Sequence, residues 1–123
     1  MLIDDSEIDL KINTKVLSLQ FAGSQIITCL SAMEALIYLK KHALQPNMLP
    51  DHILLDIQMP EMDGFGFLEA FKNLPSQLIN HCSIIILSST LDFGDLKRAE
   101  ANRFVYKTLK KPLNPKELKD LIG

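Results

Sequence analysis

Five polar residues fall where predicted strands end, and together they offer one kind of chemistry. Asp4 and Asp5 follow the first apolar strand, Asp56 ends the third, and Ser88 and Lys111 follow the fourth and fifth. Three neighbouring carboxylates repel one another unless a cation neutralises them, and a site of oxygen ligands without His or Cys suits Mg²⁺. A lysine and a hydroxyl beside them can hold a phosphoryl group, so that a carboxylate could attack phosphorus.

Each of these residues alone has an ordinary explanation. An aspartate at a strand end is usually a turn or cap residue, a serine such as Ser88 often caps the following helix, and a lysine such as Lys111 is usually solvated. The conjunction carries the prediction. The carboxyl ends of parallel strands meet at one edge of a sheet, and that edge is where such folds bind ligands.

Apolar strands and amphipathic helices alternate five times along the chain, which predicts an α/β fold with a parallel sheet covered by helices on both faces. The runs around Ile53 and Ile84 are wholly apolar, as strands buried on both sides are. Right-handed crossovers make a doubly wound sheet the leading topology. The expected strands are 1–3, 25–30, 53–57, 84–87 and 104–109, and the expected helices are 7–22, 32–43, one after Gly64 that includes 67–74, 92–102 and 116–122.

The first helix is predicted from apolar residues that recur at helical spacing. Ser6 precedes it as a plausible N-cap, and Gly23 follows it as a stop. The residues at this spacing are Ile8, Ile12, Val16 and Leu19.

Length and composition exclude several classes of protein. A chain of 123 residues fits one domain, 1–123, and its net charge of −2 gives no broad attraction to nucleic acid or anionic membrane. No apolar run exceeds five residues, far short of a membrane span, and the acidic N-terminus is no secretory signal. Cys29 and Cys82 match no metal spacing and are expected to be buried, reduced residues of a cytoplasmic protein.

Four segments in order carry a resemblance to a known family. They are I-D-D at Ile3–Asp5, I-L-L-D-I-Q-M-P-E-M-D-G at Ile53–Gly64, I-I-I-L-S-S at Ile84–Ser89 and K-K-P-L at Lys110–Leu113. The chain resembles, over essentially its whole length, the receiver domain of two-component response regulators. The resemblance implies a flavodoxin-like sheet of five parallel strands in the order 2-1-3-4-5. In that order the strands that carry Cys29 and Cys82 lie too far apart for a disulfide.

The resemblance also implies the roles of the acidic residues. Asp56 would be the phospho-acceptor. Asp5 would bind Mg²⁺ directly, Asp4 would assist, often through water, and the backbone carbonyl of Gln58 would complete the protein ligands.

The resemblance further implies how the phosphoryl group is held and where it comes from. Ser88 would hydrogen-bond it in the active state, Lys111 would form an ion pair with it, and the bond before Pro112 is often cis in this family. The donor would be a histidine kinase or a histidine phosphotransfer protein. The chain would thus be a signalling protein and not an enzyme, acting on a downstream protein through the face formed by the fourth helix, fifth strand and fifth helix.

Two departures from the family pattern affect these expectations. The family usually places Tyr or Phe three residues before the lysine, whereas this chain has Thr108 there and its nearest aromatic is Tyr106. The first strand is also short, which suggests a shortened chain or start and a less stable sheet. Because the sequence ends with the fifth helix, we expect no attached output domain, unless the chain is a fragment.

Three alternatives stay open at this point. An aspartyl-phosphate phosphohydrolase of the haloacid-dehalogenase type would need a second Asp where Gln58 stands. A flavin-binding module would need a Ser-, Thr- and Gly-rich loop after the first strand, where Asp4 and Asp5 would repel phosphate. The third alternative is a receiver-like interaction module that is never phosphorylated.

Overall fold

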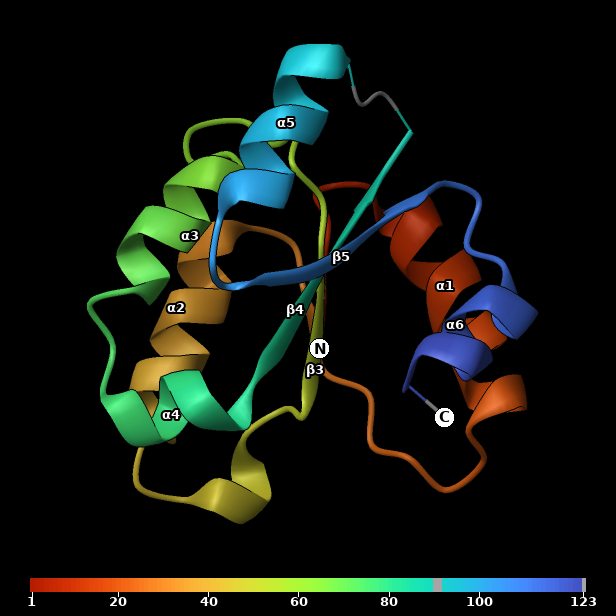
Figure 1. Ribbon diagram of the computed structural model, residues 1–123. Coiled ribbons are helices and arrows are strands. Elements are labelled where there is room, and N and C mark those ends of the chain that lie inside the picture. The colour runs from red at the N-terminus through yellow and green to blue at the C-terminus, as the bar shows by residue number, and fades with distance from the viewer. Residues whose placement is uncertain (90–91, 123) are drawn as a thin grey trace.

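The computed structural model, which describes residues 1–89 and 92–122, has a central five-stranded parallel sheet in the order β2-β1-β3-β4-β5. Figure 1 shows the sheet between two layers of helices. The strands are β1 (Leu2–Ile3), β2 (Thr28–Cys29), β3 (His52–Leu55), β4 (Ser83–Ser88) and β5 (Val105–Lys110). The predicted fold class and strand order are therefore confirmed.

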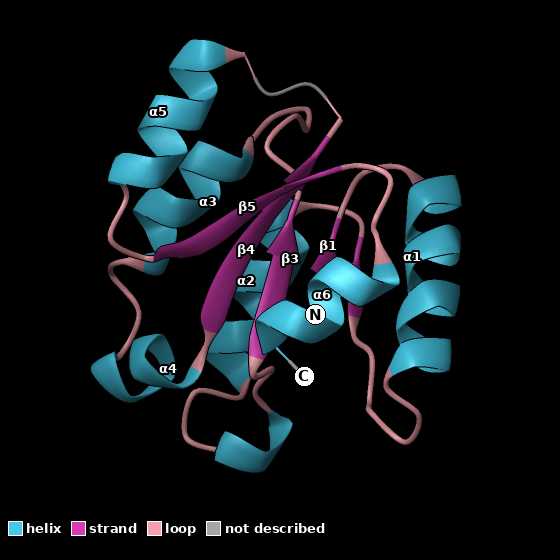
Figure 2. Cartoon of the chain, turned by 45° about the vertical axis from the view of Figure 1, so that its right-hand side comes forward, coloured by secondary structure: helices cyan, strands magenta, loops and turns pink. Residues whose placement is uncertain are grey.

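The helices divide between the two faces of the sheet (Figure 2). α1 and α6 cover one face, and α2, α3 and α5 cover the other. The described helices are α1 (Glu7–Gln20), α2 (Ala32–Lys41), α3 (Gly64–Phe71), α4 (Ser76–His81), α5 (Phe93–Ala101) and α6 (Pro115–Ile122), with a short 3₁₀ helix at Pro46–Met48. None of those helices is long and apolar enough to span a membrane.

The 3₁₀ helix and α4 were not predicted from the sequence. Pro75 stands at the N-cap of α4, and the fully buried Leu78 anchors this short helix to the core. The additional helix shifts the numbering, so that the face expected from the fourth helix, fifth strand and fifth helix is formed here by α5, β5 and α6.

The second strand is shorter than predicted. Only Thr28 and Cys29 pair with β1, because β1 itself offers just Leu2 and Ile3 as partners. A β-branched run forms a ladder only where a neighbouring strand runs beside it. The carbonyl of Ile27 still accepts from the N–H of Leu2 at 2.7 Å, and the ladder does not extend before it.

The first helix is confirmed, but the face that it buries is not the one formed by the apolar residues at helical spacing in the sequence. Ile8, Ile12 and Leu19 are 70%, 53% and 74% exposed. The residues of α1 that are buried are Leu10, Asn13 and Leu17.

Both cysteines are free and buried, as predicted. Burial raises the pKa of Cys29 to about 11 and that of Cys82 to about 12. Because the thiolate is the reactive form, both residues act as small apolar side chains.

The orientation of α1 gives the first testable prediction. Leu10→Ala should lower the free energy of unfolding by about 2–4 kcal/mol because it leaves a cavity against the sheet. Ile12→Ala, in the same helix but on its exposed side, should change it by less than about 1 kcal/mol. Urea unfolding at constant m-value measures both, and a larger loss for Ile12→Ala would show that α1 packs through its other face.

Candidate functional site

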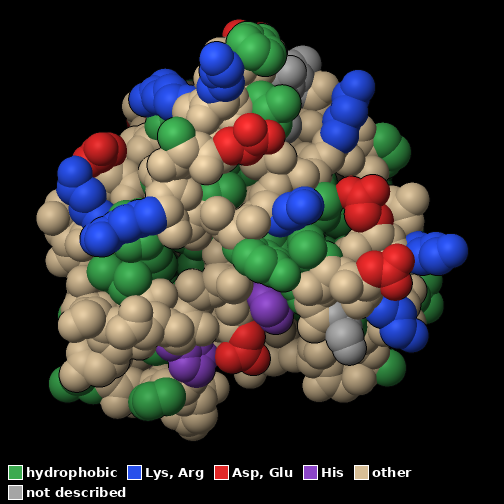
Figure 3. All heavy atoms as spheres, in the orientation of Figure 1, with side chains coloured by type: hydrophobic (Ala, Val, Ile, Leu, Met, Phe, Trp, Pro, Cys, Tyr) green, Lys and Arg blue, Asp and Glu red, His purple; other side chains and the backbone are tan. Residues whose placement is uncertain are grey.

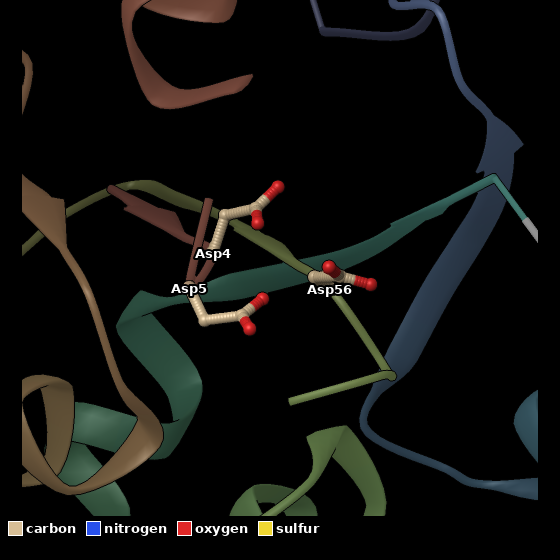
Figure 4. A group of neighbouring side chains, drawn as sticks. All are labelled: Asp4, Asp5 and Asp56. Atoms are coloured by element: carbon tan, nitrogen blue, oxygen red, sulfur yellow. The ribbon is translucent and has the colours of Figure 1, made fainter. Parts of the chain in front are cut away.

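Pairing of β1 with β3 brings three carboxylates to the carboxyl edge of the sheet. Ile3 lies opposite Leu55, so the residues that follow them, Asp4 and Asp56, are neighbours. The backbone N–H of Asp56 donates to the carbonyl of Ile3 at 3.0 Å, which fixes this register. Carboxylate oxygens of Asp4, Asp5 and Asp56 all lie within 4.8 Å of one another, and Figure 4 shows the side chains grouped at the ends of the two strands.

The three carboxylates differ in their access to solvent. Asp4 is 4% and Asp56 8% exposed, whereas Asp5 is exposed. Burial raises the pKa of Asp56 above its ordinary value, although the nearby Lys111 ammonium opposes the shift. The backbone N–H of Ser6 donates to Asp4 Oδ1 at 2.9 Å, and that of Gln58 donates to Asp56 Oδ1 at 3.1 Å. One oxygen of each buried carboxylate is thus held by the backbone of the loop that follows it.

The ammonium of Lys111 lies against these carboxylates. Its Nζ donates to Asp4 Oδ2 at 2.6 Å, to Asp9 Oδ2 at 2.9 Å and to Asp56 Oδ2 at 3.4 Å. Burial alone would lower the pKa of Lys111, but the hydrogen bonds to Asp4 and Asp9 and the charge of Asp56 outweigh it and raise the pKa. The lysine is therefore a permanent cation that offsets part of the acidic charge.

The end of β5 and the following turn position this lysine. The backbone N–H of Lys111 donates to the carbonyl of Ser88 at 3.0 Å, which ties the ends of β4 and β5 together. The peptide bond between Lys111 and Pro112 is cis, as the family resemblance implied.

The structure places the remaining predicted site residues close to this cluster. Ser88 is the last residue of β4 and is buried. Gln58 has an exposed side chain, and its backbone contacts the Asp56 carboxylate as described above. The assigned roles of the Ser88 hydroxyl and the Gln58 carbonyl stay predictions.

The loop after Asp56 depends on a glycine. A Cβ at Gly64 would lie 2.7 Å from the Ile57 Cα and 2.8 Å from the Asp56 carbonyl oxygen, so a larger residue would push α3 away from the site. The N–H of Gly64 also donates to the carbonyl of Ile57 at 2.8 Å. Asp63 caps α3 by accepting from the N–H of Gly66 at 2.8 Å. The Asp-Gly pair of the sequence motif thus begins α3 directly beside Asp56.

Two polar residues of α1 near the cluster were missed in the sequence. Asp9 contacts Lys111, and the buried Asn13 lines a cavity of about 10 Å³ together with Asp4 and Asp56. Asp9 stands four residues after Asp5, a spacing that could have placed it near the cluster. An acid in the first turn of a helix is ordinarily explained by its interaction with the helix dipole, however. That explanation gives no reason to expect the contact between Asp9 and Lys111.

Solved structures with the same architecture come from response regulators. A response regulator receiver protein from Dyadobacter fermentans superposes with a TM-score of 0.88 at 34% sequence identity, over 98% of this chain and 91% of that one. A two-component response regulator from Cytophaga hutchinsonii gives a TM-score of 0.88 at 30% identity, over 98% and 90% of the two chains.

Sequence comparison leads to the same group of proteins. The chain is 24% identical over its full length to the polar-differentiation response regulator DivK of Brucella ovis, of which it covers 94%. It is 34% identical over 69% of its length to the "Probable methanogenesis regulatory protein FilR2" of Methanothrix harundinacea, and it spans about half of that relative (53%). The family model of the response regulator receiver domain matches residues 1–123. The chain therefore belongs to the response regulator receiver domain family, whose members are signalling proteins of two-component systems.

Proposed function

We propose that this receiver domain accepts a phosphoryl group on Asp56, with Mg²⁺ bound beside it, and signals by changing its contacts with another protein. The observation that carries the proposal is the convergence of Asp4, Asp5, Asp56 and the Lys111 ammonium at one edge of the sheet. An arrangement of acids, which needs a cation, and a lysine, which pairs with phosphate, suits phosphoryl transfer.

The donor atoms around Asp56 fit Mg²⁺. All three side chains offer hard carboxylate oxygens, and one of them, Asp5, is open to solvent, as suits an ion that keeps several waters. In this proposal Asp5 binds the ion directly, Asp4 assists and Asp56 and the Gln58 carbonyl complete the ligands. Bound Mg²⁺ would neutralise charge on the phosphoryl oxygens.

The residues of the chain would carry the transfer as follows. A carboxylate oxygen of Asp56 attacks phosphorus, a new P–O bond forms, and the bond between phosphorus and the donor's leaving atom breaks with its electron pair leaving on the donor. No proton has to leave Asp56, because the attacking form is the carboxylate. Lys111 would pair with the phosphoryl oxygens and Ser88 would donate its hydroxyl hydrogen to one of them.

A histidine kinase or a histidine phosphotransfer protein would supply the phosphoryl group, in the cytoplasm. The output would be a protein contact through the face of α5, β5 and α6, where Phe93 and Tyr106 are 72% and 57% exposed. Figure 3 shows charged side chains of both signs interspersed over the face that Figure 1 presents. Mixed charge of this kind favours a protein partner over nucleic acid or an anionic membrane.

Family membership leaves one of the alternatives to be tested. The phosphohydrolase and the flavin module belong to other families, whereas a receiver that is never phosphorylated belongs to this one. Only phosphoryl uptake separates the proposal from that last alternative.

Acetyl phosphate should add one phosphoryl group to the chain only when Mg²⁺ is present, as read by intact mass. Asp56→Asn should abolish the gain, because the amide is a poor nucleophile and removes a metal ligand. Asp63→Asn, which alters an exposed acid that caps α3, serves as the control and should be labelled like the wild type. Full labelling of Asp56→Asn would assign the phosphoryl group to another residue.

Removing Lys111 should separate metal binding from phosphoryl binding. Lys111→Ala should bind Mg²⁺ at least as tightly as the wild type, since it removes a cation from Asp4 and Asp56, but it should impair phosphorylation or its consequences. Ser88→Ala should also keep its affinity for Mg²⁺. Asp5→Ala should bind Mg²⁺ at least about tenfold more weakly. Calorimetric Mg²⁺ titration measures all three, and an equal loss in Lys111→Ala and Asp5→Ala would contradict these roles.

The switch lacks the aromatic that most receivers use. Thr108 lies in β5 opposite Ile86 and is half-buried. Tyr106 also lies in β5, within the strand predicted at 104–109, beside a register shift in the pairing with Ile84 and Ile85. The Tyr106 side chain is 57% exposed, so it adds no buried apolar area to this structure.

Thr108→Tyr should therefore strengthen the response to phosphorylation. An inward-turning aromatic would add on the order of 1.5–3 kcal/mol of apolar burial to the active state, which the threonine does not provide. Amide spectra of the Mg²⁺ form with and without beryllofluoride should show small changes in α5 and β5 of the wild type and larger ones in Thr108→Tyr. Large changes in the wild type with no gain in the variant would show that this switch does not need the aromatic.

A further inference from the structure

Among residues 1–89 and 92–122, Asp9 is the side-chain partner of Lys111 that lies outside the predicted site. Its carboxylate comes from the first turn of α1 and reaches the ammonium at 2.9 Å, across 102 residues of sequence. A lysine ammonium has three N–H donors, and the three carboxylates bonded to Lys111 fill them. Lys111 is only 11% exposed, so water cannot easily replace a lost partner.

Asp4 and Asp56 can each bind two cations, the Lys111 ammonium and a divalent metal ion. Both bond to Lys111, and both belong to the group of oxygens that could hold a metal ion. A divalent ion and the ammonium compete for these carboxylates, and they repel each other when both are present. Asp9 does not belong to the metal group and can keep its bond to Lys111 while the ion occupies the other two.

The position of Asp9 is set by the start of α1. The backbone N–H of Asp9 donates to the Ser6 hydroxyl at 3.2 Å, and the N–H of Ser6 donates to Asp4. The same N-cap therefore orients both carboxylates that hold Lys111 most closely. The Asp9 side chain is 39% exposed and keeps part of its hydration, so its charge is less costly to maintain than that of Asp4.

We propose that Asp9 is a positioning residue that holds the Lys111 ammonium aside when a divalent cation binds Asp4 and Asp56, and so raises the affinity of the site for Mg²⁺. The inference rests on the proposed metal site. Without Asp9, the Lys111 ammonium would form stronger ion pairs with Asp4 and Asp56. The metal ion would then have to displace the ammonium from both carboxylates.

A double-mutant cycle read by Mg²⁺ titration tests this role. Asp9→Asn keeps the size of the side chain and should weaken Mg²⁺ binding about threefold to tenfold, whereas in a Lys111→Met background the same change should alter it by less than about twofold. Asp9→Glu should restore most of the affinity. Glu7→Gln removes an equal charge from the same helical turn at an exposed position and should have less than about twofold effect.

The outcomes separate this inference from the proposed function. An equal effect of Asp9→Asn in both backgrounds would mean that Asp9 acts through its charge or through α1 and not through Lys111, and no effect in the wild-type background would also overturn the proposal. Neither result would contradict the proposed phosphorylation of Asp56, which is measured separately by intact mass. A wild-type chain that binds no Mg²⁺ would instead remove the metal site on which both depend.

Discussion

Mutual repulsion of the carboxylates at the ends of β1 and β3 is the constraint on which the site depends. The backbone pairing of Ile3 with Leu55 places Asp4 and Asp56 side by side, and neither is open to solvent. Like charges at such a distance repel by about a few kcal/mol at an effective dielectric constant of about 20. Lys111 offsets this repulsion through its bonds to Asp4, Asp9 and Asp56.

The rest of the fold holds that cluster in place. Apolar residues of β3 and β4 are buried on both faces of the sheet, which makes the strand ends a rigid support. Gly64 lets α3 begin against the backbone of Asp56. On the other side of the cluster, the hydrogen bond from Lys111 to Ser88 joins the ends of β5 and β4. In the proposed function, a cation bound to these buried carboxylates would relieve their repulsion, and a phosphoryl group on Asp56 would change the charge that the surrounding elements face.

Much of the fold could be predicted from the sequence because the relevant signals are local. The apolar runs at β3 and β4, the capping residue Ser6 and the D-G pair at Asp63 each indicate the structure of their own segment. The strand order was read from the family resemblance and not from any local signal. The residues at the strand ends followed from the same reasoning, because all parallel strands end at one edge of the sheet.

What could not be predicted depends on contacts between distant segments. The face of α1 that is buried is decided by where α6 and the sheet lie, so Leu10 and Leu17 are buried in place of the equally apolar Ile8 and Ile12. The length of β2 is set by the two residues that β1 offers, and the short helix α4 is held by a single buried leucine. Asp9 was missed because its partner lies at the other end of the chain.

The proposed function requires that Mg²⁺ and the phosphoryl group displace the Lys111 ammonium from the carboxylates of Asp4 and Asp56. A crystal structure of the chain with Mg²⁺ and beryllofluoride tests it most directly. We expect the metal among Asp4, Asp5 and Asp56, beryllofluoride on the Asp56 carboxylate, and the Lys111 ammonium moved from Asp4 to a fluorine atom. Metal bound away from these aspartates, or Lys111 still bonded to Asp4 beside an occupied Asp56, would contradict it.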